Sequence, residues 1–63
     1  MFQEHDIVYS KRQPNSGIFY VVLSVNEHEA KCTNIGDRYN YTIPVEDLVL
    51  WIRLVRVNSK LES

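Results

Sequence analysis

The few side chains able to do acid–base or metal chemistry are scattered along this sequence of 63 residues. Glu27-His28-Glu29 offers three potential metal ligands, but neighbours on an extended chain point in different directions, and a metal site needs further ligands at fixed spacing. Cys32 could act as a nucleophile only beside a base such as histidine. Because it alternates with Ala30, we predict a small core residue instead.

The sequence contains no Ser/His/Asp set, no carboxylate pair and no glycine-rich phosphate loop. His5 and His28 lie in or beside polar segments, so we predict exposed histidines. We therefore expect a non-enzymatic protein with no catalytic residues, no metal site and no cofactor.

Composition indicates an ordered domain in a reducing compartment. Hydrophobic residues make up 44% of the chain and there are only two glycines and two prolines, which is unlike a disordered segment. The single cysteine excludes an internal disulfide. The first residues lack the basic start and apolar run of a secretion signal, and no apolar run approaches the roughly 20 residues of a membrane helix. We expect a cytoplasmic protein that does not bind membranes.

Aromatic and basic residues occur close together at two places and could hold a nucleic acid. Stacked bases and neutralised phosphates need this combination, and the same aromatics could form a cage for a methylated cation. The net charge of −1 argues against a strongly basic surface, and tyrosines that cover a thin core offer a simpler explanation. The candidates for this alternative are Tyr9, Lys11, Arg12, Arg38 and Tyr39.

The pattern of apolar residues and turn formers predicts an all-β domain of five short strands. Alternation and β-branched residues mark the strands, while Pro14 to Gly17 and Gly36 mark turns. Pro44 followed by Glu46 and Asp47 predicts one helical turn. The expected strands are residues 6–10, 18–26, 29–34, 39–43 and 49–57, with the helical turn at 44–48.

The second expected strand has one face that is apolar throughout and one that is mixed, so we place the apolar face in the core. The inward residues would be Phe19, Val21, Leu23 and Val25, and the outward residues Ile18, Tyr20, Val22 and Ser24.

The final strand carries the strongest functional signal, because both of its faces are apolar and so small a domain cannot bury both. One face would hold Leu50, Ile52 and Leu54, and the other Val49, Trp51, Val55 and Val57, interrupted by Arg53. Trp and Arg are enriched at interface hot spots. We predict a partner-binding surface of Trp51, Arg53, Val55 and Tyr20. Because Val45, Leu48, Val49, Ile52 and Val55 also fit a helical stripe, an antiparallel sheet with a C-terminal helix is the alternative fold.

The order of features resembles the small SH3-like barrels of the KOW, Tudor and plasmid or phage kinds. The residues that carry this resemblance are Asp6-Ile7-Val8, Gly17 at the start of the second strand, and Tyr41-Thr42-Ile43-Pro44-Val45-Glu46-Asp47-Leu48. The resemblance implies a five-stranded SH3-like barrel with one helical turn before the last strand. Closure of the sheet would protect its edges.

One enzyme shares this shape class, the plasmid-borne type II dihydrofolate reductase, in which a Val-Gln-Ile-Tyr strand lines the pore of a tetramer. Tyr41-Thr42-Ile43-Pro44 would occupy that place here. Threonine and proline replace the glutamine and the tyrosine, so the resemblance predicts no such activity. An oligomeric enzyme with its site on a symmetry axis remains a third alternative.

Together these features predict one β-barrel domain over residues 1–57 and a polar tail over 58–63. Its function would be protein–protein interaction, as a homodimer or docked on a larger protein. A phage- or plasmid-encoded regulator or inhibitor of a host protein fits so small a domain, and nucleic-acid binding is the alternative.

Overall fold

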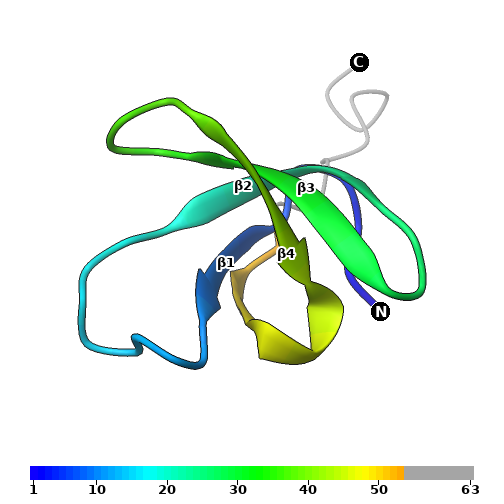
Figure 1. Cartoon of the computed structure of the whole chain (residues 1–63), viewed down its shortest axis with the longest axis horizontal. Coiled ribbons are helices and arrows are strands. Elements are labelled where there is room, and N and C mark those ends of the chain that lie inside the picture. Colours follow the sequence, from blue (N-terminus) through cyan, green and yellow to red (C-terminus); the bar gives the residue numbers. More distant parts are fainter. Residues whose placement is uncertain (54–63) are drawn as a thin grey trace, which may run out of the picture.

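The chain forms one small antiparallel sheet in the computed structural model, which describes residues 1–53 (Figure 1). A 3-10 turn, η1 (Val45–Asp47), precedes the last strand. The predicted all-β class with one helical turn is therefore confirmed, and residues 48–52 form a strand instead of the alternative helix. Val55, the rest of the final expected strand and the tail lie outside the described residues. The strands are β1 (Ile7–Ser10), β2 (Tyr20–Val25), β3 (Glu29–Asn34), β4 (Asn40–Pro44) and β5 (Leu48–Ile52).

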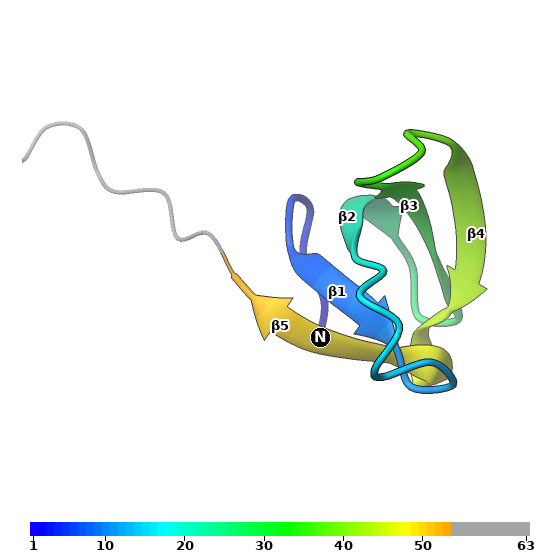
Figure 2. The ribbon, with the colours of Figure 1, turned by 90° about the vertical axis from the view of Figure 1, so that its left-hand side faces the viewer.

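The strand order is β4-β3-β2-β1-β5, so the last strand, β5, pairs with the first strand, β1. The sheet bends so that the β1–β5 ladder and the β2–β3–β4 meander lie at an angle to each other (Figure 2). The expectation of a closed barrel is wrong, because β4 and β5 are the two edges of the sheet. Pro44 ends β4 without a backbone donor, and η1 carries the chain across to β1.

The core lies on the inner face of the bent sheet and consists mostly of small side chains. The predicted burial of Ala30 and Cys32 is confirmed, since both are fully buried. The buried apolar residues are Val8, Val22, Ala30, Cys32 and Leu48, and Phe2, Tyr20, Val25, Ile43 and Val45 pack around them.

The predicted orientation of β2 is wrong for most of its length. Val22 is fully buried and Tyr20 packs against the core, whereas Leu23 is 39% exposed. The register passes from Val22↔Cys32 to Ser24↔Lys31, so Leu23 is the extra residue of a β-bulge. A bulge changes which face the following residues occupy, and Val25 therefore returns to the core. Strict alternation could not predict this shift.

The loops are tied together at the end of the sheet that carries η1. Val45 N donates to the carbonyl of His28 at 3.0 Å, and Lys11 N donates to the carbonyl of Asp47 at 2.7 Å. Arg12 Nε lies 3.3 Å from Asp47 Oδ2. These contacts fix the start of β5 relative to both the β1–β2 and β2–β3 loops.

Candidate interaction surface

Trp51 occupies a β-bulge in β5. Val8 pairs with Leu50 and Ile7 pairs with Ile52, which leaves Trp51 as the extra residue between them. Bulges redirect side chains away from the regular alternation. Trp51 is 54% exposed, and its ring stacks on Phe19 with ring centroids 4.2 Å apart and an interplanar angle of 23°.

Phe19 contacts both Trp51 and Tyr9, and a backbone hydrogen bond fixes its position. Tyr9 of β1 meets its ring edge-on, with centroids 6.2 Å apart. The carbonyl of Phe19 accepts a hydrogen bond of 3.0 Å from Ile35 N, in the β3–β4 loop. The stack therefore joins β5, β1 and the segment before β2 to a loop that is distant in sequence.

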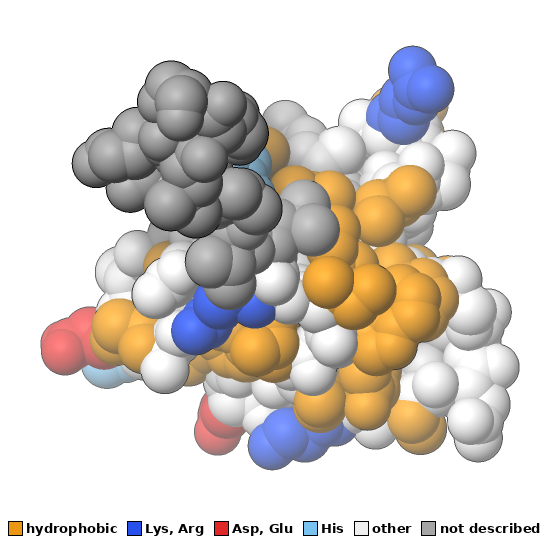
Figure 3. Space-filling model, turned by 180° about the vertical axis from the view of Figure 1, so that it is seen from behind, with side chains coloured by type: hydrophobic (Ala, Val, Ile, Leu, Met, Phe, Trp, Pro, Cys, Tyr) orange, Lys and Arg blue, Asp and Glu red, His pale blue; other side chains and the backbone are white. Residues whose placement is uncertain are grey.

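A groove of about 400 Å³ opens beside the stacked rings. One wall comes from the segment before β2, the other from the β3–β4 loop, and Trp51 closes one side. Hydrophobic side chains gather between these two loops on the face seen in Figure 3. We call this site the aromatic groove; it is lined by Gly17, Ile18, Phe19, Asn34, Ile35, Gly36 and Trp51.

Asn34 builds the β3–β4 wall of the aromatic groove. Its Oδ1 accepts hydrogen bonds from Gly36 N at 2.7 Å and from Asp37 N at 3.2 Å. Its backbone N donates to the carbonyl of Tyr39 and its carbonyl accepts from Arg38 N. This local hydrogen bonding by an Asn side chain fixes the turn, and a Cβ on Gly36 would lie 3.2 Å from Asn34 Oδ1. The wall is therefore set in place before any ligand arrives.

A row of apolar side chains crosses the outer face of the sheet next to Trp51. Ile52 pairs with Ile7, and Ile7 pairs with Val21. Cross-strand partners lie on the same face, so these three residues form a continuous row, which we call the outer row. Ile52 is 40% exposed. The predicted grouping of Ile52 with Leu50 is wrong, since Leu50 pairs with the buried Val8 on the inner face.

Arg53 forms hydrogen bonds with the N-terminal segment of its own chain. Its Nε donates to Asp6 Oδ1 and its Nη2 to Asp6 Oδ2, both at 3.0 Å, while Nη2 also donates to the carbonyl of Met1 at 2.9 Å. Asp6 is only 1% exposed and accepts a further hydrogen bond from Gln3 N. The hydrogen-bonded Arg53 guanidinium lowers the pKa of Asp6, against the opposing effect of burial. This pair fastens residues 1–6 to the end of β5.

Tyr20 lies on the opposite face from Trp51. It pairs with Asn34 in the β2–β3 register, packs against the core and meets the ring of Tyr41 edge-on at 5.8 Å. The structure therefore does not bring Tyr20, Arg53 and Trp51 into one surface, and Trp51 alone among them lies at the aromatic groove.

Four of the five nucleic-acid candidates occupy two separate loops, and the fifth, Tyr9, lies in β1. Lys11 and Arg12 belong to the β1–β2 loop, and Arg38 and Tyr39 to the β3–β4 loop. Figure 3 shows basic side chains above and below the hydrophobic area. Arg12 pairs with Asp47, and Tyr9 lies against Phe19. Tyr39 is the most exposed candidate among the tyrosines, at 70%.

The remaining reactive side chains do not assemble into a site. His28 pairs with its neighbour Glu27 at 3.6 Å on the surface. Within residues 1–53, no three His, Cys, Asp or Glu side chains could hold one metal ion. Burial raises the pKa of the Cys32 thiol to about 11. No helix in the described part of the chain is long and apolar enough to cross a membrane.

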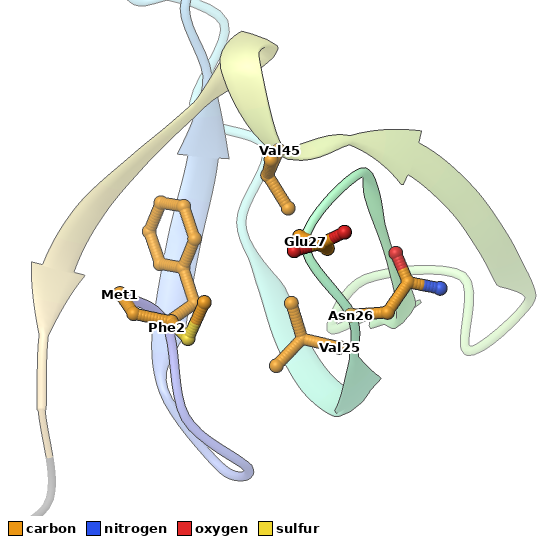
Figure 4. Close-up of a pocket in the computed structure, with 6 residues that line it drawn as sticks. All are labelled: Met1, Phe2, Val25, Asn26, Glu27 and Val45. Carbon is orange, nitrogen blue, oxygen red and sulfur yellow. The ribbon is translucent and has the colours of Figure 1, made fainter.

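A second, smaller pocket of about 150 Å³ lies where the N-terminal segment crosses the open end of the core. Figure 4 shows Phe2, Val25 and Val45 pointing toward this space from three different segments. All three pack against the core cluster. The pocket is thus the incompletely filled margin of the core, which Phe2 covers.

The sequence pattern predicts an interaction role for Trp51 but none for Ile18, Phe19 and Ile35, which line the aromatic groove with it. Phe19 was assigned to the core because it fits the alternation of β2, although β2 begins only at Tyr20. Ile35 stands alone in a turn and is 49% exposed. A large apolar residue inside an otherwise polar turn is the one signal that could have drawn attention to this wall.

Comparisons of this chain with protein-family models, with curated proteins and with solved structures found no match.

Proposed function

We propose that this protein is a non-enzymatic interaction module that binds an apolar segment of another protein in the aromatic groove. The observation that carries this proposal is the half-exposed Trp51 ring, stacked on Phe19 at the side of a groove of about 400 Å³. Pockets of this size accommodate small groups of apolar atoms. An extended segment that inserts one or two apolar side chains matches the lining.

The energetics support Trp51 as the anchor of binding. A tryptophan exposes up to about 250 Å², so the 54% of Trp51 that faces solvent corresponds to about 130 Å². Burial of that area contributes about 3 kcal/mol at 25 cal/mol per Å². Interface hot spots are enriched in tryptophan and cost at least about 2 kcal/mol when truncated.

The proposal includes an SH3-like fold for the module. The strand order, the pairing of β5 with β1 and the 3-10 turn before β5 support this resemblance. A cytoplasmic regulator or inhibitor encoded by a phage or plasmid, acting on a host protein, is the setting that we propose. Fold likeness alone does not establish function, so the groove carries the proposal.

Trp51 is the only tryptophan in the chain, so its fluorescence reports directly on the groove. We would select binders from a random peptide library with the wild-type protein and then titrate the enriched peptides. The expected peptides carry apolar side chains, shift the emission of Trp51 and are not bound by Trp51→Ala. Circular dichroism would check that the variant stays folded, which the exposure of Trp51 predicts.

Tyr39→Ala provides the matched control, because Tyr39 is an exposed aromatic residue that does not line the groove. This variant should bind the selected peptides like the wild type. Failure to enrich any peptide, or equal binding by Trp51→Ala, would contradict the groove as the binding site.

Nucleic-acid binding is the second candidate function, and the basic side chains above and below the hydrophobic area in Figure 3 favour it. A single-stranded oligonucleotide would be titrated at rising salt. Affinity that falls steeply with salt, and falls again in Arg38→Ala, would support this alternative. The Arg12–Asp47 pair and the net charge of −1 lead us to favour a protein partner.

A further inference from the structure

Residues 1–4 cross the open margin of the core outside the strands of the sheet, and we call them the strap. Phe2 packs against the core cluster, whereas Met1 is 93% exposed and Gln3 and Glu4 are also exposed. A segment with so little buried apolar surface opens more readily than the core strands of a domain. The strap thus depends mainly on one side chain, Phe2, for its packing.

Unfilled space adjoins Phe2 in two directions. The pocket of about 150 Å³ lies toward Val25 and Val45, and a further hollow of about 120 Å³ lies toward Leu50 and Arg53. Phe2 is part of the lining of both. Since protein interiors are close-packed and leave few voids, space on both sides of one aromatic residue means that Phe2 fills its place incompletely.

The hydrogen bonds that close the strap meet at one carboxylate. Asp6 Oδ2 accepts from Gln3 N at 2.8 Å, and Arg53 Nη2 donates to this oxygen at 3.0 Å and to the carbonyl of Met1 at 2.9 Å. His5, between Gln3 and Asp6, has φ +75, a backbone conformation that costs free energy in any residue other than glycine. A few polar contacts and a strained turn therefore hold the strap in place.

We propose that the strap is a lid over a second binding site, which takes a small, neutral aromatic compound in place of the Phe2 ring when the strap opens. The group that fills the site in the closed protein is a phenyl ring with space beside it, so a flat ring of equal or larger size matches the site. An apolar cavity of about 150 Å³ is large enough to bind benzene. This site shares no lining residue with the aromatic groove, and the proposal does not rest on the groove.

The lining favours an uncharged ligand. Val25 and Val45 point toward the space that Phe2 covers (Figure 4). Asp6, the buried carboxylate of the described chain, is already hydrogen-bonded to Arg53 and offers nothing to a cationic ligand. A charged compound would lose its water here without gaining a partner, whereas an apolar ring replaces the contacts that Phe2 gives up.

Amide hydrogen exchange of the full chain tests whether the strap opens while the sheet stays folded. Gln3 N–H donates to the side chain of Asp6, and Val22 N–H donates to the carbonyl of Asp6 from within β2. The protection factor of Gln3 should be at least about a hundredfold lower than that of Val22. Equal protection would mean that the strap opens only on global unfolding, and would overturn the proposal.

Indole is the probe for the site itself. In two-dimensional NMR spectra it should shift the methyl signals of Val25 and Val45, which line the space that Phe2 covers. A site that is open for less than about a tenth of the time binds at least about tenfold more weakly than the same site held open. Phe2→Ala removes the competing ring, so this variant should bind indole about tenfold more tightly than the wild type.

Because Phe2→Ala could impair folding, exchange in the wild type provides a second measurement. Bound indole keeps the strap open and stabilises the folded sheet. It should therefore lower the protection of Gln3 N–H and raise that of Val22 N–H. A rise in the protection of both amides would contradict displacement of the strap.

Phe19→Ala is the matched control, because Phe19 is the other phenylalanine of the chain and lines the aromatic groove instead. This variant should bind indole under the strap as the wild type does. Indole that shifts only the groove residues Ile18 and Ile35, or that binds Phe2→Ala no more tightly than the wild type, would overturn the proposal. These results are separable from the groove proposal: a groove that selects no peptide leaves the strap site standing, and a strap that admits no indole leaves the groove standing.

Discussion

Replacement of Asp6 by asparagine tests how far one buried ion pair holds this domain together. The substitution keeps the shape of the side chain but removes the charge that receives two hydrogen bonds from Arg53. Hydrogen bonds to charged groups contribute about 1.5–3 kcal/mol, and Asp6 is almost completely buried. We expect Asp6→Asn to lower the free energy of unfolding by about 2 kcal/mol at neutral pH.

That loss is large for a chain of this length. At about 0.05–0.15 kcal/mol per residue, a domain of 63 residues has a stability of roughly 3–9 kcal/mol. A change of 1 kcal/mol moves the melting temperature of a small domain by about 4–8 °C, so we expect a decrease of about 8–16 °C. Urea unfolding followed by circular dichroism, and thermal melts, measure both quantities.

The pH dependence supplies a sharper test of the same pair. Arg53 lowers the pKa of Asp6 in the folded protein below its ordinary value of 3.8. The unfolded chain therefore binds this proton more readily, and the contribution of Asp6 is complete above pH 3.8 and is lost as pH falls through the folded pKa. The stability difference between wild type and Asp6→Asn should narrow over that range.

Glu27→Gln is the control. Within residues 1–53, Glu27 forms an ion pair with the exposed His28 alone, so the substitution should change stability by less than about 0.5 kcal/mol. The reasoning would be refuted if Asp6→Asn were as stable as the wild type at neutral pH. A stability difference that stays constant down to pH 2.5, about one unit below the ordinary pKa, would also refute it.

Three further experiments test side-chain burial and backbone conformation. Because burial raises the pKa of Cys32 to about 11, iodoacetamide at pH 8 should label the folded protein far more slowly than the urea-unfolded protein, and equal rates would contradict the burial. Val22→Ala should destabilise the fold by about 2 kcal/mol and Leu23→Ala by less than about 1 kcal/mol, as judged by urea unfolding, and the reverse order would mean that Leu23 and not Val22 faces the core. Gly17 has φ +77 and open space around its Cβ position, so Gly17→Asn should preserve stability better than Gly17→Val in thermal melts; equal melting temperatures would exclude backbone strain there.

The sequence was sufficient to predict the number of strands and their approximate positions along the chain. Turn formers and Pro44 separate the apolar runs, and Pro44 with the acidic pair behind it indicates the 3-10 turn that the structure contains. The helical stripe through Val45, Leu48 and Ile52 was a competing pattern, and the β-branched content of the segment favoured the strand. These signals are local, which is why they could be recognised without the fold.

The errors arise from features that depend on contacts between strands. Bulges at Leu23 and Trp51 change which face of the sheet the following residues occupy. Neither leucine nor tryptophan indicates a bulge in the sequence. The bulge at Trp51 separates Ile52 from the face of Leu50, and the bulge at Leu23 returns Val25 to the core. The inward prediction for Leu23 has another cause: the uniformly apolar face of β2 was expected inside, whereas Tyr20 and Val22 face the core. The pairing of Arg53 with Asp6 joins the two ends of the described chain, and alternation along one strand carries no information about such a partner.

The candidate site was predictable only in part for the same reason. Trp51 stood out because a tryptophan in a two-faced apolar strand is hard to bury in so small a core. Its stacking partner Phe19 and the opposite wall at Ile35 come from segments that only the folded chain brings together. Whether Val55 contributes was a prediction that falls outside the described residues.

The pairing of the first strand with the last also sets the order in which this domain can form. β1 to β4 pair in sequence order, so the contacts among them are comparatively local, whereas the pairing of β5 with β1 spans almost the whole described chain and forms later. On a ribosome, Asp6 is made early but has no counter-ion until Arg53 has been synthesised. The pairing of β5 with β1 therefore completes the fold. Until these two strands pair, β5, the most apolar of the five strands, has no partner in the sheet.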